Sequence, residues 1–358
     1  MVKVGSSSLV DDAGVLAPRR LAKVVRDVAA VSRDRAAVLV SSGAIAAGFR
    51  ALGVRRRPRD MPGLQAAAAV GQGRLMADYA RLFARQGVVA AQVLLTREDV
   101  VRRRHFVNAR NTLERLLSAG VLPVVNENDT VATEEIRFGD NDHLAALVAV
   151  MIRADLLVLL SDVDGIYSRD PRRGGATLLE EVTDLDAVEA TGPSSALGLG
   201  GMASKVEAAR VATSAGTGVV VARAGERDVI DRIVRGERVG TWVAPAGRRT
   251  RGRKAWIAFA SGVRGRIVVD AGAERAVRDD GRSLLAAGVV AVEGSFAAGD
   301  PVEVSGPSGA PFARGIVGYS SEELPRLAGR STKDLAAAPG GPSDGEVTPR
   351  DELVVVGR

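Results

Sequence analysis

One stretch, residues 121–150, constrains the fold of this chain more than any other. It begins with the apolar run Val121 to Val125, which is typical of a strand buried on both faces. The run ends in Asn126-Glu127-Asn128-Asp129, and Gly139-Asp140-Asn141-Asp142 then leads into an apolar helical pattern from Leu144. Because ligands bind at strand ends in open α/β sheets, the two polar clusters predict a site. The alternative for either cluster alone is a turn or a helix cap.

Strand and helix patterns alternate over roughly the first 240 residues. This alternation predicts βαβ units, and therefore an α/β fold with a mainly parallel central sheet sandwiched by helices. The expected strands are residues 1–5, 36–40, 88–94, 121–125, 155–160 and 218–221. The expected helices are residues 19–31, 65–83, 109–117, 144–151 and 206–214.

The pattern changes after a stretch rich in proline, glycine and basic residues, Pro245 to Lys254. Short expected strands follow at residues 266–269, 289–292, 302–304 and 352–356, with a short helix at residues 321–327. A chain of 358 residues is long enough for two domains. We therefore expect a first domain over residues 1–245, a linker over 246–254 and a small β-rich domain over 255–358.

The composition excludes several kinds of site. The chain has no cysteine, which removes disulfides, thiol nucleophiles and cysteine-zinc sites. With only His105 and His143, a serine–histidine triad and a multi-histidine metal site are not expected. No apolar run approaches the roughly 20 residues of a membrane helix, and no export segment is evident. We expect a cytoplasmic enzyme that uses carboxylates, lysines and backbone amides.

The charge is unevenly distributed. The formal net charge is +6, but residues 252–358 carry 13 basic and 14 acidic side chains, so the excess lies in residues 1–251. A weakly basic large domain suits an anionic substrate. The alternative for local runs such as Arg55 to Arg57 is solvated surface.

Lysine is rare, and its placement is informative. Only five of the 49 basic residues are lysine, yet Lys3 and Lys205 each adjoin a glycine-rich turn. A compact ammonium fits between phosphate oxygens where a wide guanidinium does not. The glycines before Lys205 open a helix, and such helix starts bind anions. The spacing of these glycines matches neither a Walker A loop nor a dinucleotide fingerprint. The alternative is that the two lysines lie beside glycine-rich turns by chance.

Five motifs with these features occur in order along the chain. The sequence resembles the amino acid kinase family through Lys3-Val4-Gly5-Ser6-Ser7, Ser41-Ser42-Gly43-Ala44-Ile45, Asn126-Glu127-Asn128-Asp129, Gly139-Asp140-Asn141-Asp142 and Gly200-Gly201-Met202-x-x-Lys205. The resemblance covers nearly the whole chain, because such enzymes often end in a PUA module where this chain becomes β-rich. It implies ATP-dependent phosphorylation of the side-chain carboxylate of L-glutamate, the first step towards proline, with feedback inhibition by proline.

The resemblance also implies roles for individual residues. Lys3 would stabilise the phosphoryl group in transfer, Lys205 would neutralise the β- and γ-phosphates of ATP, and Asp142 would hold both lysines. The residues expected to bind glutamate are Ser42, Asp129 and Asn141, with Asp140 and Asn126 nearby. The residues expected to contact the nucleotide are Lys3, Ser161, Asp162, Leu199, Gly200, Gly201, Met202, Ala203, Ser204 and Lys205. Mg²⁺ would bridge the phosphates through water and nucleotide oxygens, with no protein ligand assigned.

Three positions depart from the family pattern, and two other functions stay open. The segment before Lys3 is shorter than usual, Ser161 stands where threonine is usual, and Leu199 where a polar residue is usual. One alternative is a related kinase acting on acetylglutamate, aspartate or a nucleoside monophosphate. The other is RNA binding by the PUA-like module, which we do not expect because that module is net negative and poor in aromatics. We expect a homo-oligomer, a dimer or tetramer, since the long helix from Gln65 offers an association surface.

Overall fold

The computed structural model describes residues 1–96, 99–100, 102–131, 141–169, 174–185, 187–188, 201–245, 254, 257–258, 263–331 and 345–356. It divides the chain into two compact units. The first comprises residues 1–100 and 104–249, and the second comprises residues 101–103 and 250–358. Among the described residues, no helix combines the length and the apolar character needed to cross a membrane.

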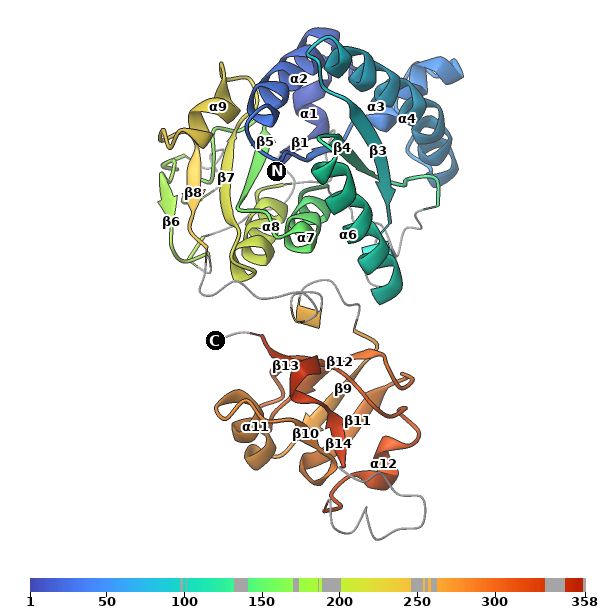
Figure 1. The fold of residues 1–358 in the computed structure, drawn as a ribbon, viewed down its shortest axis with the longest axis vertical. Helices are drawn as coiled ribbons and strands as arrows, with labels where there is room; N and C mark the ends of the chain where they lie inside the picture. Colours follow the sequence, from blue (N-terminus) through green and yellow to red (C-terminus); the bar gives the residue numbers. More distant parts are fainter. Residues whose placement is uncertain are drawn as a thin grey trace. The chain divides into compact units, whose positions relative to one another are not determined.

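A single sheet organises the first unit (Figure 1). Its strand order is β3-β4-β2-β1-β5-β7-β8-β6, and its neighbours pair in parallel except for β7 with β8. The strands are β1 (Val2–Val4), β2 (Leu39–Ser41), β3 (Ala90–Leu95), β4 (Leu122–Glu127), β5 (Leu156–Ser161), β6 (Glu181–Val182), β7 (Gly218–Arg223) and β8 (Thr241–Val243). The mainly parallel sheet is therefore confirmed, and β4 is buried along its whole length as its apolar run predicts.

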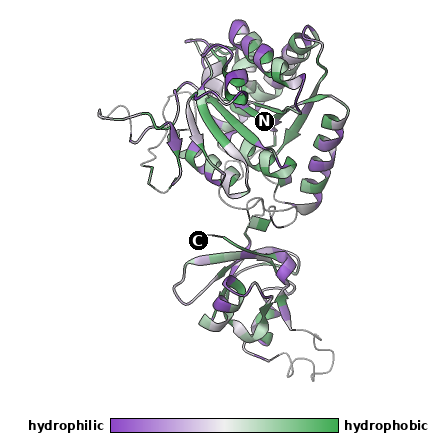
Figure 2. Cartoon of the chain, turned by 60° about the vertical axis from the view of Figure 1, so that its left-hand side comes forward, coloured by the Kyte–Doolittle hydropathy of each residue, from purple (hydrophilic) through white to green (hydrophobic). Residues whose placement is uncertain are grey.

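Helices cover both faces of this sheet. Figure 1 shows α2, α3, α4 and α9 on one side and α6, α7 and α8 on the other. The helices are α1 (Ser6–Leu9), α2 (Pro18–Ser32), α3 (Ala44–Gly48), α4 (Met61–Ala84), α6 (Arg103–Ser118), α7 (Asn141–Ile152), α8 (Met202–Ser214) and α9 (Val229–Val234). Figure 2 shows hydrophobic residues concentrated along the central strands, whereas helices such as α6 carry hydrophilic residues as well.

The alternation of side chains along β1 decides which of them enters the site. Val2 and Val4 belong to the hydrophobic cluster that also contains Leu21 of α2 and Leu75 of α4. Successive side chains of a strand point to opposite faces. Lys3 therefore points to the other face, which α7 and α8 cover.

The second unit has its own β-rich core. A five-stranded sheet has the order β11-β9-β12-β13-β15, and β10 pairs with β14. Phe312 is fully buried in its hydrophobic cluster. The elements are β9 (Gly265–Val269), α11 (Ala271–Arg278), β10 (Leu284–Leu285), β11 (Val289–Gly294), β12 (Pro301–Ser305), β13 (Pro311–Ile316), α12 (Leu324–Leu327), β14 (Glu346–Thr348) and β15 (Leu353–Val355).

The expected elements are present, but several boundaries differ. The long helix α4 begins at Met61 rather than Gln65, because Asp60 caps it by accepting a hydrogen bond from the amide of Gly63. The helix expected over residues 321–327 shortens to α12, whose first turn holds Pro325. Several short elements, among them β8, α9 and α11, were not expected, because three to eight residues give too little periodicity to recognise.

Candidate active site

Three buried charged side chains meet above the centre of the sheet. Lys3, Asp142 and Lys205 are 3%, 0% and 6% exposed. One carboxylate oxygen of Asp142 forms an ion pair with Nζ of Lys3, and the other lies 3.0 Å from Nζ of Lys205. Buried charges are tolerated when they are paired. Two ammonium groups around one carboxylate leave this trio with one unit of positive charge, which suits an anionic ligand.

Three elements bring these side chains together. Lys3 is the middle residue of β1, Asp142 lies in the first turn of α7, and Lys205 lies one turn into α8. An acidic residue is favourable at a helix N-terminus because of the helix dipole. Helices α7 and α8 pack against each other, so their N-terminal turns present Asp142 and Lys205 to the same point. The structure thus joins parts of three motifs that are distant in sequence.

A second cluster consists of neutral amides and hydroxyls. Nδ2 of Asn141 lies within hydrogen-bond distance of three acceptors, Oδ1 of Asn126 at 3.0 Å, Oγ of Ser42 at 2.8 Å and the carbonyl of Ser41 at 3.2 Å, which share its two hydrogens. Within the described part of the chain, Oδ1 of Asn141 is buried and accepts no hydrogen bond. Buried polar atoms are normally satisfied. This oxygen is therefore a natural acceptor for a donor group of a ligand.

The turn that carries Ser42 has a conformation that requires glycine. Gly43 has φ of +110°, which L-residues rarely adopt, and α3 starts at the next residue. The amide of Ser42 donates to the carbonyl of Val4 at 3.1 Å, which ties this turn to β1. The predicted junction of strand, turn and helix is thus present, and it places Ser42 beside Asn141.

The other residues predicted to bind glutamate differ in how closely they are connected to this cluster. Asn126, the last residue but one of β4, is 2% exposed and belongs to the amide cluster. Asp129 lies partly buried in the turn that follows β4. Asp140 lies outside the described residues.

Apart from Lys3, the described residues that are predicted to contact the nucleotide lie at the end of β5 and at the start of α8. Ser161 ends β5, and its hydroxyl donates to Oδ1 of Asp162 at 3.0 Å. Gly201 is the N-cap of α8, whose first turn contains Met202, Ala203 and Ser204. The hydroxyl of Ser204 lies 3.4 Å from Oδ2 of Asp142, so this turn adjoins the charged trio. Leu199 and Gly200 lie outside the described residues.

An ion pair beside Ser161 was not predicted from the sequence. Arg223 ends β7 next to Ser161, and its Nε and Nη2 both donate to Asp164 in the loop after β5. The hydroxyl of Tyr167 also donates to Asp164, at 3.0 Å. The hydrogen bond from Arg223 holds the pKa of Asp164 below its usual range. This pair joins the ends of β5 and β7, and its only sequence signal was a turn-rich loop after a strand.

Two polar residues of α4 also form hydrogen bonds with residues of the site. Oε1 of Gln72 accepts a hydrogen bond from Nδ2 of Asn126 at 2.7 Å. The hydroxyl of Tyr79, fully buried, lies 2.7 Å from Oγ of Ser41, and burial raises the pKa of Tyr79 well above its ordinary value. The alanine-rich sequence of this helix predicts an association surface and gives no indication of a role in the site. The available signal was a lone glutamine between glycines in an otherwise apolar stretch.

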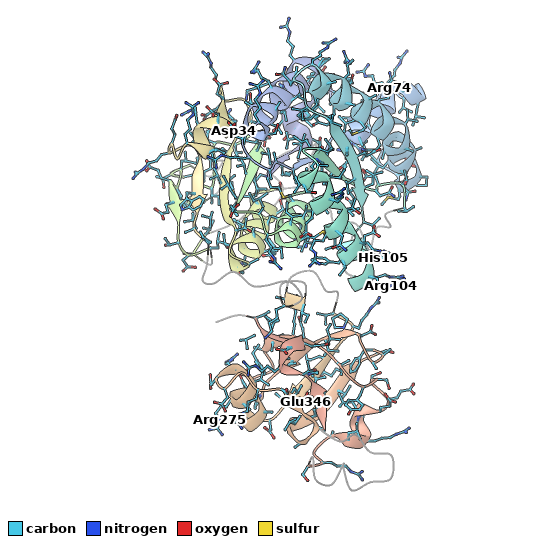
Figure 3. The ribbon with its side chains drawn as sticks, viewed as in Figure 1. Asp34, Arg74, Arg104, His105, Arg275 and Glu346 are labelled. Carbon is cyan, nitrogen blue, oxygen red and sulfur yellow. The ribbon has the colours of Figure 1, made fainter. Side chains whose placement is uncertain are left out.

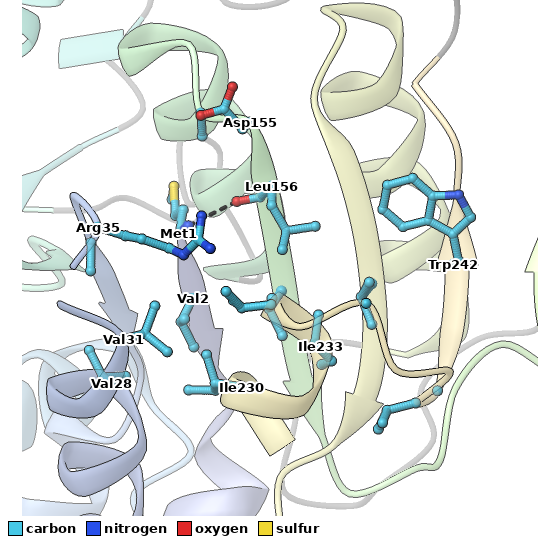
Figure 4. Close-up of a pocket in the computed structure, with 18 of the residues that line it drawn as sticks. Met1, Val2, Val28, Val31, Arg35, Asp155, Leu156, Ile230, Ile233 and Trp242 are labelled. Carbon is cyan, nitrogen blue, oxygen red and sulfur yellow. Dashed lines mark hydrogen bonds between the residues drawn. The ribbon is translucent and has the colours of Figure 1, made fainter. Parts of the chain in front are cut away.

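A cavity of about 780 Å³ lies elsewhere in the first unit. Figure 4 shows it around the beginnings of β1 and β5, with Val28, Ile230 and Trp242 among its walls and the Met1 amino group donating to the carbonyl of Leu156. The charged trio instead lies towards the helix starts that follow the strand ends. This cavity is therefore separate from the candidate active site.

Known proteins match this chain over nearly its whole length. The model of the amino acid kinase family matches residues 1–223, and the model of the PUA domain matches residues 265–338. The glutamate 5-kinase of Streptomyces coelicolor is 52% identical over 362 residues, covering 99% of this chain and 96% of that protein. The glutamate 5-kinases of Frankia casuarinae and Myxococcus xanthus are 51% and 47% identical, each covering 99% of this chain and 96% of the relative. The chain belongs to the amino acid kinase family and carries a C-terminal PUA domain.

Proposed function

We propose that this chain transfers the γ-phosphoryl group of ATP to the side-chain carboxylate of L-glutamate, the reaction of a glutamate 5-kinase. The product is glutamyl 5-phosphate, and the reaction is the first step of proline biosynthesis. The observation that carries the proposal is the buried Lys3–Asp142–Lys205 trio beside the Asn126–Asn141–Ser42 amide cluster. Relatives about half identical over nearly the full chain support the choice of glutamate.

The reaction needs charge stabilisation more than proton transfer. A side-chain carboxyl with a pKa of about 4.3 is already ionised at neutral pH. Its oxygen forms the new bond to the γ-phosphorus, the bond from that phosphorus to the bridging oxygen breaks, and ADP leaves with the electron pair. No general base is required. A site built from fixed positive charges is therefore sufficient.

The trio would supply those charges. Lys3 would contact the phosphoryl group in transfer, and Lys205 would contact the β- and γ-phosphates. Asp142, which pairs with both, would keep the two ammonium groups at a fixed separation. Charges held in place before the reaction need no reorganisation while negative charge moves from the carboxylate to ADP.

The amide cluster would bind the amino acid. Asn141 would offer to the α-ammonium group its Oδ1, which accepts no hydrogen bond from the described residues. Ser42 would donate its hydroxyl proton to a carboxylate, since its oxygen already accepts from Asn141. Asp129 would lie near the α-ammonium group, where a negative charge attracts rather than repels the substrate. Asn126 and Asp140 would complete this part of the site.

The nucleotide would lie against the start of α8 and the end of β5. Backbone amides and the helix dipole at the N-terminus of α8 favour phosphate. The proposed contacts are Ser161, Asp162, Leu199, Gly200, Gly201, Met202, Ala203 and Ser204. Among the described residues, no three histidine, aspartate or glutamate side chains gather in a way that could hold a metal ion. Mg²⁺ would accompany the phosphates of ATP.

The remaining parts of the proposal concern the whole chain. We propose a kinase domain over residues 1–245, a linker over 246–254 and a PUA domain over 255–358, in a cytoplasmic enzyme inhibited by proline. We also propose a homo-oligomer, a dimer or tetramer, supported by the exposed apolar side chain of Val70 on α4.

A substrate panel tests the proposed reaction. With ATP and Mg²⁺, we expect phosphorylation of L-glutamate and not of acetylglutamate, aspartate or uridine monophosphate. The acyl phosphate is identified by trapping it with hydroxylamine. Preferential turnover of one of the other acceptors would contradict the assignment of glutamate, while leaving a kinase of the same family.

A further inference from the structure

We propose that Gln72 is a positioning residue for the amino acid substrate, an inference that rests on the proposed function. Gln72 lies on α4, outside every motif that identifies the site. Its Oε1 accepts a hydrogen bond from Nδ2 of Asn126, a side chain that is only 2% exposed. Through Asn126, Gln72 supports the orientation in which Oδ1 of the Asn141 amide faces the substrate.

The orientation of both amides follows from backbone groups whose roles cannot change. The amide of Glu127 donates to Asn126 at 2.9 Å, so the atom it meets must be the oxygen Oδ1. The carbonyl of Ser41 can only accept, so the atom of Asn141 that lies 3.2 Å away must be Nδ2. These two constraints leave Nδ2 of Asn126 to find an acceptor inside the protein.

Gln72 provides that acceptor, and the consequence reaches the substrate. With Nδ2 of Asn126 held at 2.7 Å from Gln72, Oδ1 of Asn126 is free to accept from both Glu127 and Asn141. Nδ2 of Asn141 is thereby used within the protein, and Oδ1 of Asn141 is the atom without a partner among the described residues. The substrate then meets an acceptor that suits an ammonium group.

The packing of α4 against α3 explains how Gln72 reaches Asn126. A Cβ atom at Gly71 would overlap the carbonyl of Ala44 in α3, and one at Gly48 would overlap the carbonyl of Ala67 in α4. The two helices therefore cross with their backbones in contact. Since α3 begins two residues after Ser42, this crossing fixes the distance between Gln72 and the Ser42 turn.

The expected effect of removing the acceptor is specific to one substrate. In Gln72→Met, which keeps the length of the side chain, Nδ2 of Asn126 loses its acceptor. A buried unsatisfied donor is costly, so we expect the Asn126 side chain to shift and to hold Asn141 less firmly. We expect the KM for glutamate to rise about tenfold, with kcat and the KM for ATP changed less than about twofold. Gln72→Glu keeps an acceptor at the same position and is expected to restore part of the lost affinity.

The experiment compares steady-state kinetics of the full chain and five variants. Arg74→Met is the matched control, because Arg74 lies on the exposed side of the same helix (Figure 3) and receives the same replacement. The other variants are Gln72→Met, Gln72→Glu, Asn126→Ala and the double variant of Gln72→Met with Asn126→Ala. If Gln72 acts through Asn126, adding Gln72→Met to Asn126→Ala leaves the KM for glutamate unchanged.

Each result has a distinct meaning. A parent enzyme that does not phosphorylate glutamate would overturn the proposed function and this inference together. A parent that does so, with an unchanged KM for glutamate in Gln72→Met, would overturn the inference alone. If the double variant raised the KM for glutamate by the product of the two single effects, the inference would also be overturned. If Gln72→Met lowers kcat and the thermal midpoint without raising that KM, its role is structural and not positional.

Discussion

At the scale of single residues, the site depends on one carboxylate that serves two lysines. Removing the charge of Asp142 leaves two buried ammonium groups around a neutral amide, and breaking buried pairs in this way is strongly destabilising. We expect Asp142→Asn to lower kcat at least about 100-fold and to lower the thermal midpoint, as measured by ADP release and calorimetry.

A buried aspartate elsewhere provides the control for that prediction. Asp27 is 4% exposed and pairs with Lys23 at 2.8 Å within α2. Asp27→Asn is expected to reduce stability while leaving kcat within about twofold of the parent, since the charges it disturbs are not in the trio. Equal losses of kcat in both variants would show that Asp142 acts only through folding.

The Arg223–Asp164 pair makes a second prediction at this scale. Because it joins the ends of β5 and β7 beside Ser161, we expect Asp164→Asn to raise the KM for ATP several-fold and to leave the KM for glutamate unchanged. The folded-state pKa of Asp164 is lowered by Arg223, so its contribution to stability is present above the unfolded pKa of about 3.9 and disappears as the pH falls further.

Thermal unfolding as a function of pH tests this assignment. The midpoint of the parent is expected to exceed that of Asp164→Asn at pH 7, and the difference is expected to shrink below about pH 4. A difference that persists unchanged into acid would contradict the pairing as its cause.

The residue scale also shows what a sequence can and cannot reveal. Lys3 and Lys205 were recognisable because a phosphate-binding ammonium beside glycines is a local pattern. Gln72 was not, because its partner Asn126 is 54 residues away and the contact exists only after α4 packs against α3. The Arg223–Asp164 pair likewise depends on two strands meeting, 59 residues apart.

At the scale of elements, the crossing of α3 and α4 positions the glutamate side of the site. Gly71→Ala would force the two backbones apart, since the added methyl would overlap the carbonyl of Ala44. We expect a loss of about 1–3 kcal/mol in the free energy of unfolding, together with a higher KM for glutamate, because Ser42 and Gln72 would both move.

Gly73→Ala on the same helix is the matched control. A Cβ at Gly73 would meet nothing within 4 Å. Replacing a helical glycine in open space is expected to stabilise the protein by about 0.5–1 kcal/mol, with unchanged kinetics. Denaturant unfolding measures both variants, and equal stability of the two would contradict the tight crossing.

The elements themselves were largely predictable. The buried strand β4 and the helices α2, α4, α7 and α8 follow from apolar runs and helical periodicity in the sequence. The antiparallel pairing of β7 with β8 could not be foreseen, because β8 has only three residues and its direction is set by the sheet it joins. Boundaries shifted where a cap such as Asp60 extended a helix beyond its apolar pattern.

At the scale of the whole molecule, each compact unit has its own hydrophobic core. Phe312 is fully buried in the second unit, and truncating such a side chain costs about 3–5 kcal/mol. In Phe312→Ala we expect faster amide hydrogen exchange across residues 265–331 and unchanged protection of β1 and β5 in the first unit. Loss of protection in both units to the same extent would contradict separate cores.

We propose that two lysines in a buried trio stabilise the phosphoryl group as it passes from ATP to glutamate. The most direct measurement is glutamate-dependent ADP release with ATP and Mg²⁺ by the parent, Lys205→Ala and the control Lys23→Ala, whose lysine pairs with Asp27 away from the trio. We expect turnover in the parent and in Lys23→Ala, with a loss of at least about 100-fold in folded Lys205→Ala. ADP release that does not depend on glutamate, or that survives in Lys205→Ala, would overturn the proposed role of the trio.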